Sequence, residues 1–215
     1  MKYIFGTLAF AALTACGGSN MDSVPSGPTV GQLQNQIVAL QADQRRISDQ
    51  TITSFANMPT TGSSTFNGGV VIGAERGATD INLIGDSSLT VNFASEQMTG
   101  RANNFRGFNA DGQLFNASGQ LNYSGGAIGV EGDARNLTYN VNGNLGAGTD
   151  ILAVNGAVVG QFSGNRTNGP IRTKAFQAVG GSAGSTTATL LGVPTLTSTI
   201  NGGAAATSIA IIGEN

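Results

Sequence analysis

The side chains that most often perform catalysis or bind metals are scarce in this sequence. Its 215 residues include no histidine and one cysteine. A zinc site built from Cys and His, or a Ser-His-Asp triad, therefore cannot be assembled, and one cysteine excludes a disulfide within the chain. The net charge of −2 offers no basic surface for nucleic acid. We therefore expect a protein that is not an enzyme and that holds no metal or cofactor.

The carboxylates are the remaining candidates for acid–base chemistry. Most of them fall at predicted turns, and no two are forced together, so we expect solvated loop charges and assign no catalytic residue. An enzyme that uses Asp or Glu alone stays as an alternative. The carboxylates considered are Glu75, Asp80, Asp86, Glu96, Asp111, Glu131, Asp133 and Asp150.

Two further segments are weak candidates for ligand binding. Arg101 and Arg106 flank Asn103, Asn104 and Phe105 in a predicted loop. They could contact an anionic partner through the planar guanidinium groups, or they could be solvated strand ends. The segment 146–152 fits most of one calcium-binding nonapeptide repeat, but such sites need tandem copies, so a hairpin turn is the better interpretation.

Cys16, the one cysteine, follows a short export-like segment. Lys2 gives a positive start, and the apolar run 4–13 is too short to span a membrane as a helix. The sequence Leu13-Thr14-Ala15-Cys16 resembles the lipobox of bacterial lipoproteins. That resemblance implies removal of a signal peptide 1–15, lipidation of the Cys16 thiolate and an outer membrane location, on either face. The alternative is an ordinary secretory signal with an incidental cysteine.

Two short segments follow the lipobox. The segment 16–28 is rich in Gly, Ser and Pro and predicts a flexible tether. The segment 29–50 predicts an amphipathic helix of about Thr29–Asp49, with Thr29 as its N-cap. Its apolar residues fall on heptad positions a and d: Val30, Leu33, Ile37, Leu40 and Ile47.

The heptad pattern leaves two structures open for this helix. Val and Ile at a with Leu at d favour a two-stranded parallel coiled coil, and therefore a homo-oligomer. Fewer than three full heptads are marginal, however, since helices of this length are barely stable alone. The helix could instead pack on the following domain or fray.

From about residue 60, apolar and polar residues alternate with a period of two, which predicts strands. The longest example is Phe115, Ala117, Gly119, Leu121 and Tyr123, alternating with polar residues. Turn formers such as Asp111-Gly112 separate the runs. The eight predicted strands are 64–72, 87–94, 97–104, 113–123, 127–131, 135–142, 151–163 and 171–180, with a weaker run at 80–84.

Strands of this length favour a mainly β fold, a single eight-stranded antiparallel β-barrel over residues 60–180. The alternative, a parallel β-solenoid, needs a fixed repeat that the apolar clusters lack. Closure also removes exposed sheet edges. Open edges are often protected from pairing with other chains by lysine side chains, and this chain has only two lysines. The Gly/Ser/Thr/Ala-rich tail 181–215 could add strands or lie disordered.

Four features of the barrel segment carry a family resemblance: Gly62–Gly68, Leu89–Phe93 followed by Met98-Thr99-Gly100, Val158–Gly164 and Gly169-Pro170. They resemble segments of the barrel domains of transferrin-binding protein B and its relatives. It covers roughly residues 60–180. Gln161 and Ser163 depart from the family, as do Arg172 and Lys174, where an acidic residue is expected. Only one barrel is present, so transferrin capture is not implied.

The resemblance implies a lipid-anchored, non-enzymatic binding protein of the outer membrane or cell surface. Its expected partners are the membrane, through palmitate and related acyl chains at Cys16, and a protein or small ligand bound by the barrel loops. A filled barrel interior is expected, although a lipocalin-like cavity stays possible in principle. The alternative is a structural or assembly lipoprotein that oligomerises through residues 29–49.

Overall fold

The computed structural model of the protein describes residues 28–50, 52–53, 57–128, 137–164, 175–191 and 195–215. The predicted signal peptide, Cys16 and most of the tether lie outside these residues. The described helices are α1 (Val30–Ser48) and α2 (Thr186–Leu191). The described strands are β1 (Ser63–Arg76), β2 (Thr79–Asn92), β3 (Gln97–Asn109), β4 (Leu114–Asn116), β5 (Ser118–Ile128), β6 (Leu137–Ala147), β7 (Asp150–Ser163), β8 (Ala175–Gly181), β9 (Leu196–Ile200), β10 (Gly203–Ala204) and β11 (Ala206–Glu214).

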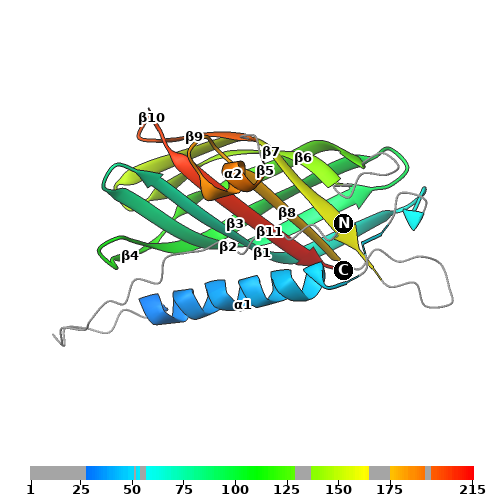
Figure 1. Ribbon diagram of the computed structural model, residues 1–215, viewed down its shortest axis with the longest axis horizontal. Helices are drawn as coiled ribbons and strands as arrows, with labels where there is room; N and C mark the ends of the chain where they lie inside the picture. Colours follow the sequence, from blue (N-terminus) through cyan, green and yellow to red (C-terminus); the bar gives the residue numbers. More distant parts are fainter. Residues whose placement is uncertain (1–27, 51, 54–56, 129–136, 165–174, 192–194) are drawn as a thin grey trace.

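The strands close into a barrel in which neighbours run antiparallel (Figure 1). Going around the barrel, the order is β1, β2, β3, β5, β6, β7, β8 and β11, and β11 pairs again with β1. Val70 of β1 lies opposite Ile211 of β11, and Val159 of β7 lies opposite Val179 of β8. The predicted eight-stranded antiparallel barrel is therefore confirmed.

The barrel boundary predicted at residue 180 is wrong, because the tail supplies the closing strand. β11 pairs with both β1 and β8, so the barrel extends to the end of the chain. Its buried residues Thr207, Ile209 and Ile211 alternate with half-buried ones. That period of two was present in the sequence, but two short apolar patches in a Gly- and Ala-rich tail were not enough to predict a strand.

One error inside the barrel compensates for the missing strand in the count. The predicted strand 113–123 covers β4 and the first part of β5, and the described residues of the predicted strand 127–131 are the end of β5, which is irregular between Ser124 and Ala127. One barrel strand was therefore counted as two, and residues 129–131 lie outside the described residues. The weaker run at 80–84 joins 87–92 in β2 and pairs with β1, so it extends the first hairpin, as the sequence suggested. Gly125 and Gly126 have positive φ and bend β5 without ending its pairing to β6.

One position around the barrel is shared by two strands in line. β7 pairs with β8 through residues 159–163 and with β9 through residues 152–156. β8 and β9 therefore lie end to end beside β7, and the segment of chain that connects them contains α2. On the outside of β8, a Cβ at Gly181 would come 2.5 Å from the Ala188 nitrogen, so α2 lies close against this strand.

The barrel interior is filled by side chains, as expected. Phe66 packs against Phe162 and Phe176, with ring centroids 5.8 Å and 5.6 Å apart. Tyr139 contacts both Tyr123, at 5.3 Å, and Phe176, at 6.4 Å. These aromatic rings and the branched side chains around them form one continuous buried cluster, the arrangement typical of small eight-stranded barrels.

The predicted helix is confirmed, and it packs on the outside of the barrel. Thr29 caps it in a capping box: its hydroxyl accepts from the Gln32 N–H, and the Gln32 side chain accepts from the Thr29 N–H at 2.7 Å. Leu33, Ile37 and Ile47 are buried between the helix and the wall. In Figure 1, α1 lies along the lower side of the barrel. Of the alternatives left open for this helix, the structure shows α1 packed on the barrel and not frayed.

Candidate functional site

A groove of about 320 Å³ runs between α1 and the outer wall of the barrel. The helix contributes one side of the groove, and strands β1, β2 and β3 contribute the floor and the other side. The residues that line it are Gln36, Ala39, Leu40, Asp43, Gly68, Gly69, Ile84, Gly85, Asp86, Asn104 and Arg106. Because the barrel interior is filled, this polar groove is the best candidate for a ligand site.

A β-bulge shapes the strand side of the groove. Ile84 pairs with Arg106 and Asp86 with Asn103, so two residues of β3 lie opposite Gly85. The extra residue, Asn104, has φ of 55°, a left-handed conformation uncommon for residues other than glycine. Its side-chain Nδ2 donates to Asp86 Oδ2 at 2.8 Å, which holds the bulge across the two strands. Bulges are frequent next to binding sites because they redirect side chains.

Small residues let the helix and the bulge come close to the wall. A Cβ at Gly69 would come 2.6 Å from Leu40 Cδ2, so a larger residue would force this helix side chain to move. A Cβ at Gly85 would come 2.6 Å from the Phe105 ring. Phe105 itself is buried in the barrel interior, under the bulge. Glycine at 69 therefore lets α1 approach the wall, and glycine at 85 leaves room for Phe105 under the bulge.

The groove carries charges of both signs. Asp43 lies on α1, Asp86 on β2 and Arg106 on β3. Asp43 pairs with Arg46 at 3.1 Å, whereas Arg106 has no ion pair with any other described residue. Arg106 is exposed, so its five donors are available to an oxygen-bearing group. Such a groove can hold a small polar group, or a polar side chain of a partner, by hydrogen bonds and charge.

Arg46 also holds α1 against the barrel beside the groove. Its Nη1 donates to Glu214 Oε1 at 2.8 Å, which ties α1 to the end of β11. The hydrogen bond to Glu214, followed by that to Asp43, raises the pKa of the Arg46 guanidinium. On the same turn, Ser48 Oγ donates to Gln177 Oε1 at 3.0 Å. The helix side of the groove is therefore held at its C-terminal end.

The two arginines predicted as a weak ligand-binding cluster are not brought together. Arg106 lines the groove, but Arg101 lies on another part of the wall, between Ser88 and Asn122. The predicted loop around them is wrong, because residues 97–109 form the continuous strand β3. Its irregular alternation comes from the bulge at Asn104, a feature that a period-two pattern alone does not predict.

Two carboxylates face each other, contrary to the expectation that no two are forced together. Glu75 and Asp80 are direct partners across β1 and β2. Burial raises the pKa of Asp80, the hydrogen bond from Asn82 opposes this shift, and the charge of Glu75 adds to it. They lie at the hairpin end of the two strands. Glu131 and Asp133 lie outside the described residues.

The segment 146–152 forms the predicted hairpin turn. Ala147 pairs with Asp150 across β6 and β7, and Gly148 has positive φ in the turn between them. Asp150 accepts from Asn201 Nδ2 at 2.6 Å. No group of three potential metal ligands occurs in the part of the chain that the structure describes.

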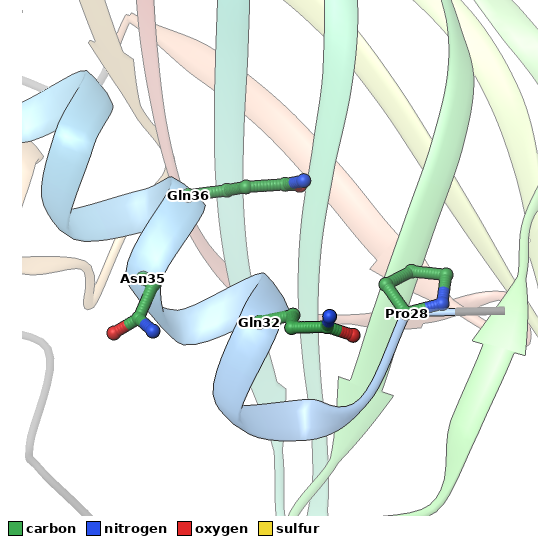
Figure 2. Close-up of a pocket in the computed structure, with 4 residues that line it drawn as sticks. All are labelled: Pro28, Gln32, Asn35 and Gln36. Carbon is green, nitrogen blue, oxygen red and sulfur yellow. The ribbon is translucent and has the colours of Figure 1, made fainter.

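A second, shallower hollow of about 470 Å³ lies at the start of α1. Pro28, Gln32, Asn35 and Gln36 line it, all from the helix and the residue before its cap. Figure 2 shows that the Gln32 side chain extends toward Pro28, whereas Asn35 points away. Gln32 is engaged in the capping box. This hollow has no charged lining residue and offers less chemistry than the groove.

Buried hydroxyls in the interior do not form a site. Tyr123 Oη lies 3.1 Å from Ser87 Oγ, whereas Tyr139 Oη is buried with no hydrogen-bond partner among the described residues. Burial raises the pKa of both tyrosines. They therefore stay neutral and contribute packing.

Comparison with known proteins identifies no relative. No family model, no curated protein and no solved structure matches the chain significantly. Neither of the described helices is long and apolar enough to cross a membrane.

Proposed function

We propose that the protein is a lipid-anchored, non-enzymatic binding protein of the outer membrane or cell surface. The observation that carries the binding role is the groove beside α1: it has charged side chains beside apolar ones, it lies outside a filled barrel, and it presents Arg106, which has no ion pair with another described residue. A ligand of such a barrel has to bind on its exterior. A protein surface loop or a small polar molecule fits a groove of this size.

The anchor is supported by the position of the one cysteine. Cys16 follows Leu13-Thr14-Ala15, and a Gly- and Ser-rich segment separates it from α1. Acylation at Cys16 would hold the barrel at a membrane surface, and more than one acyl chain is needed for stable anchoring. The tether would leave the groove accessible to partners.

A likeness to transferrin-binding protein B barrels supports the same role. The segments that carry the likeness lie at the ends of barrel strands: 62–68 begins β1, Leu89–Phe93 and Met98–Gly100 flank the β2–β3 turn, and 158–164 ends β7. In addition, the closed eight-stranded architecture is the one that this likeness implies. We therefore infer a related binding scaffold with a single barrel.

The anchor is tested in a double-membraned bacterium that expresses the full chain with a labelled palmitate analogue. The expected result is that the wild-type chain takes up the label and fractionates with the outer membrane. Cys16→Ala should take up no label and leave the membrane fraction. A wild-type chain that stays unlabelled in the cytosol would refute the proposal.

The binding role is tested by photo-crosslinking in the full-length lipoprotein. A photoreactive residue at Ala39 lies in the groove, and one at Val38, which is exposed outside it, is the matched control. The expected product forms from position 39 only and disappears in Arg106→Ala but not in Arg101→Ala. Equal crosslinking from both positions, or no effect of Arg106→Ala, would contradict binding in the groove.

Assembly through residues 29–49 is the alternative. The apolar stripe of α1 that would form a coiled coil is occupied by the barrel wall, since Leu33, Ile37 and Ile47 are buried there. Oligomerisation through it would require the helix to leave the wall. A concentration-independent monomer in analytical ultracentrifugation rejects this alternative.

A further inference from the structure

A second outer surface of the barrel, which we call the open wall, consists of exposed neutral polar side chains. It lies on β3, β5, β6 and β7, and in Figure 1 the last three strands run along the upper side of the barrel, away from α1. Among its outward side chains only Arg101 is charged. The open wall comprises Thr99, Arg101, Gln120, Asn122, Ser124, Asn140, Asn142, Asn144 and Asn155, all exposed.

The strand register arranges these side chains in rows across the wall. Arg101 pairs with Asn122, Asn122 with Asn142, and Asn142 with Asn155. A parallel row runs from Thr99 through Ser124 to Asn140, and a third joins Gln120 to Asn144. Neighbours within a row are ~4.8 Å apart and the rows are ~6.8 Å apart. The wall is therefore a regular lattice of hydrogen-bonding groups.

Most amides of this lattice are available for binding. Gln120 Nε2 donates to Asn122 Oδ1 at 2.7 Å, but Asn140, Asn142 and Asn144 make no side-chain hydrogen bond with other described residues. Each free amide offers two donors and an acceptor. Arg101 adds a planar fork of donors in the central row.

The composition of the open wall selects among possible partners. Protein interfaces are centred on aromatic and apolar anchors, and none of the residues that make up the open wall is one. The apolar side chains that face outward beside it, Ile151, Ala153, Ala157 and Val159, all lie on β7, and of these only Ile151, at the hairpin end, is largely exposed. Nucleic acid requires several cations, and lipid surfaces require an apolar or basic face. One arginine cannot neutralise a regularly charged polymer. An uncharged chain rich in hydroxyl groups complements the wall.

We propose that the open wall binds a neutral polysaccharide chain. The amides donate to and accept from the sugar hydroxyls, and Arg101 donates to two neighbouring sugar oxygens. The lattice spacing along a row is close to the size of one sugar ring, so successive sugars can meet equivalent side chains on successive strands. This proposal is separate from the groove beside α1 and does not depend on lipidation of Cys16.

The test uses the full chain in detergent and affinity electrophoresis in gels that contain dextran, a β-glucan or the acidic polymer alginate. We expect retardation by at least one neutral polysaccharide that persists at high salt. Asn122→Ala/Asn142→Ala should weaken it about tenfold or more, as expected for the loss of two hydrogen-bonding side chains. Gln34→Ala/Asn35→Ala on α1 is the matched control and should retain wild-type retardation.

Three results would overturn the proposal. The first is no retardation by either neutral polymer. The second is retardation by alginate alone that salt abolishes, which would indicate charge attraction. The third is retardation that the open-wall double variant leaves unchanged while its circular dichroism spectrum and unfolding midpoint match the wild type. If the double variant fails to fold, Arg101→Gln, which replaces the guanidinium by a neutral amide, is tested instead and judged by the same criterion.

Discussion

The barrel has two outer walls of opposite chemistry. Under α1, most outward side chains of β1, β8 and β11 are small or apolar, and we call the following residues the covered wall: Gly69, Val71, Ala175 and Ile212. On the open wall, the outward positions of β5 and β6 are mostly amides and hydroxyls, and β7 adds Asn155. The inward side chains are equally buried on both sides. The strands thus share one core and differ in what their outer faces contact.

This difference explains why α1 packs on the covered wall. A strand whose two faces are both apolar must be covered on both, and β8, buried at every residue, is the extreme example. A strand that alternates strictly, such as β6, needs no cover. The apolar stripe of α1 therefore matches the only described wall that excludes water on its outer side.

The largest expected effect comes from removing a helix side chain that the covered wall buries. Ile47 is fully buried against Ala175 and Ile212. We expect Ile47→Ala to lower the free energy of unfolding by about 2–4 kcal/mol, because it removes apolar burial and leaves a cavity. Asn142→Ala on the open wall should change it by less than about 0.5 kcal/mol.

Urea unfolding followed by circular dichroism measures both variants. Hydrogen exchange adds a second readout, since detachment of α1 alone would speed exchange in the helix and leave the barrel strands protected. Equal losses for Ile47→Ala and Asn142→Ala would contradict the distinction between the walls.

A smaller effect is expected from enlarging the covered wall. Gly69→Val places a branched side chain against Leu40, where even a Cβ would be 2.6 Å from Cδ2. Leu40 can move, so we expect a loss of about 1–3 kcal/mol, typical of overpacking. Ser124→Val, at an exposed open-wall position, should be neutral within about 0.5 kcal/mol or slightly stabilising, because β-branched residues favour strands.

Thermal unfolding and limited proteolysis check this pair of variants. Gly69→Val should expose the chain around α1 to cleavage before the barrel unfolds. A Gly69→Val protein as stable and as resistant as the wild type would mean that the helix does not depend on close approach at this glycine.

The two walls also explain how much the sequence predicts. Thr29, the heptad stripe and the alternating strands predicted the helix and the closed barrel, because each depends on local periodicity. The closing strand β11 was missed, since its partner β1 is more than 130 residues away and its own pattern is short. The groove was missed almost completely: Arg106 was a candidate, but Asp43, Gly69 and Asp86 meet it only through helix docking and a bulge.

The smallest effect is expected from Asp80→Asn, which introduces an amide, the side-chain type of the open wall, at the hairpin end of β1 and β2. Asp80 faces Glu75, and its pKa is raised above the ordinary 3.8, mainly by burial. A raised pKa means that the folded state holds the proton more tightly than the unfolded state. The ionised Asp80 carboxylate therefore lowers the free energy of unfolding. The loss is absent at a pH below the pKa of Asp80 in the unfolded state, and it grows as the pH rises from that value through the pKa in the folded state.

Asp80→Asn should accordingly raise the free energy of unfolding at pH 7 by a few tenths of a kcal/mol, a value limited by solvent screening of a half-exposed pair. Near pH 3 the gain should vanish, and the Asn82 side chain can still donate to the new amide oxygen. Asp111→Asn, in the turn between β3 and β4, is the control with no facing carboxylate on a paired strand. Urea titrations at both pH values measure the difference, and a gain that is equal at pH 3 and pH 7 would show that charge at Asp80 is not its cause.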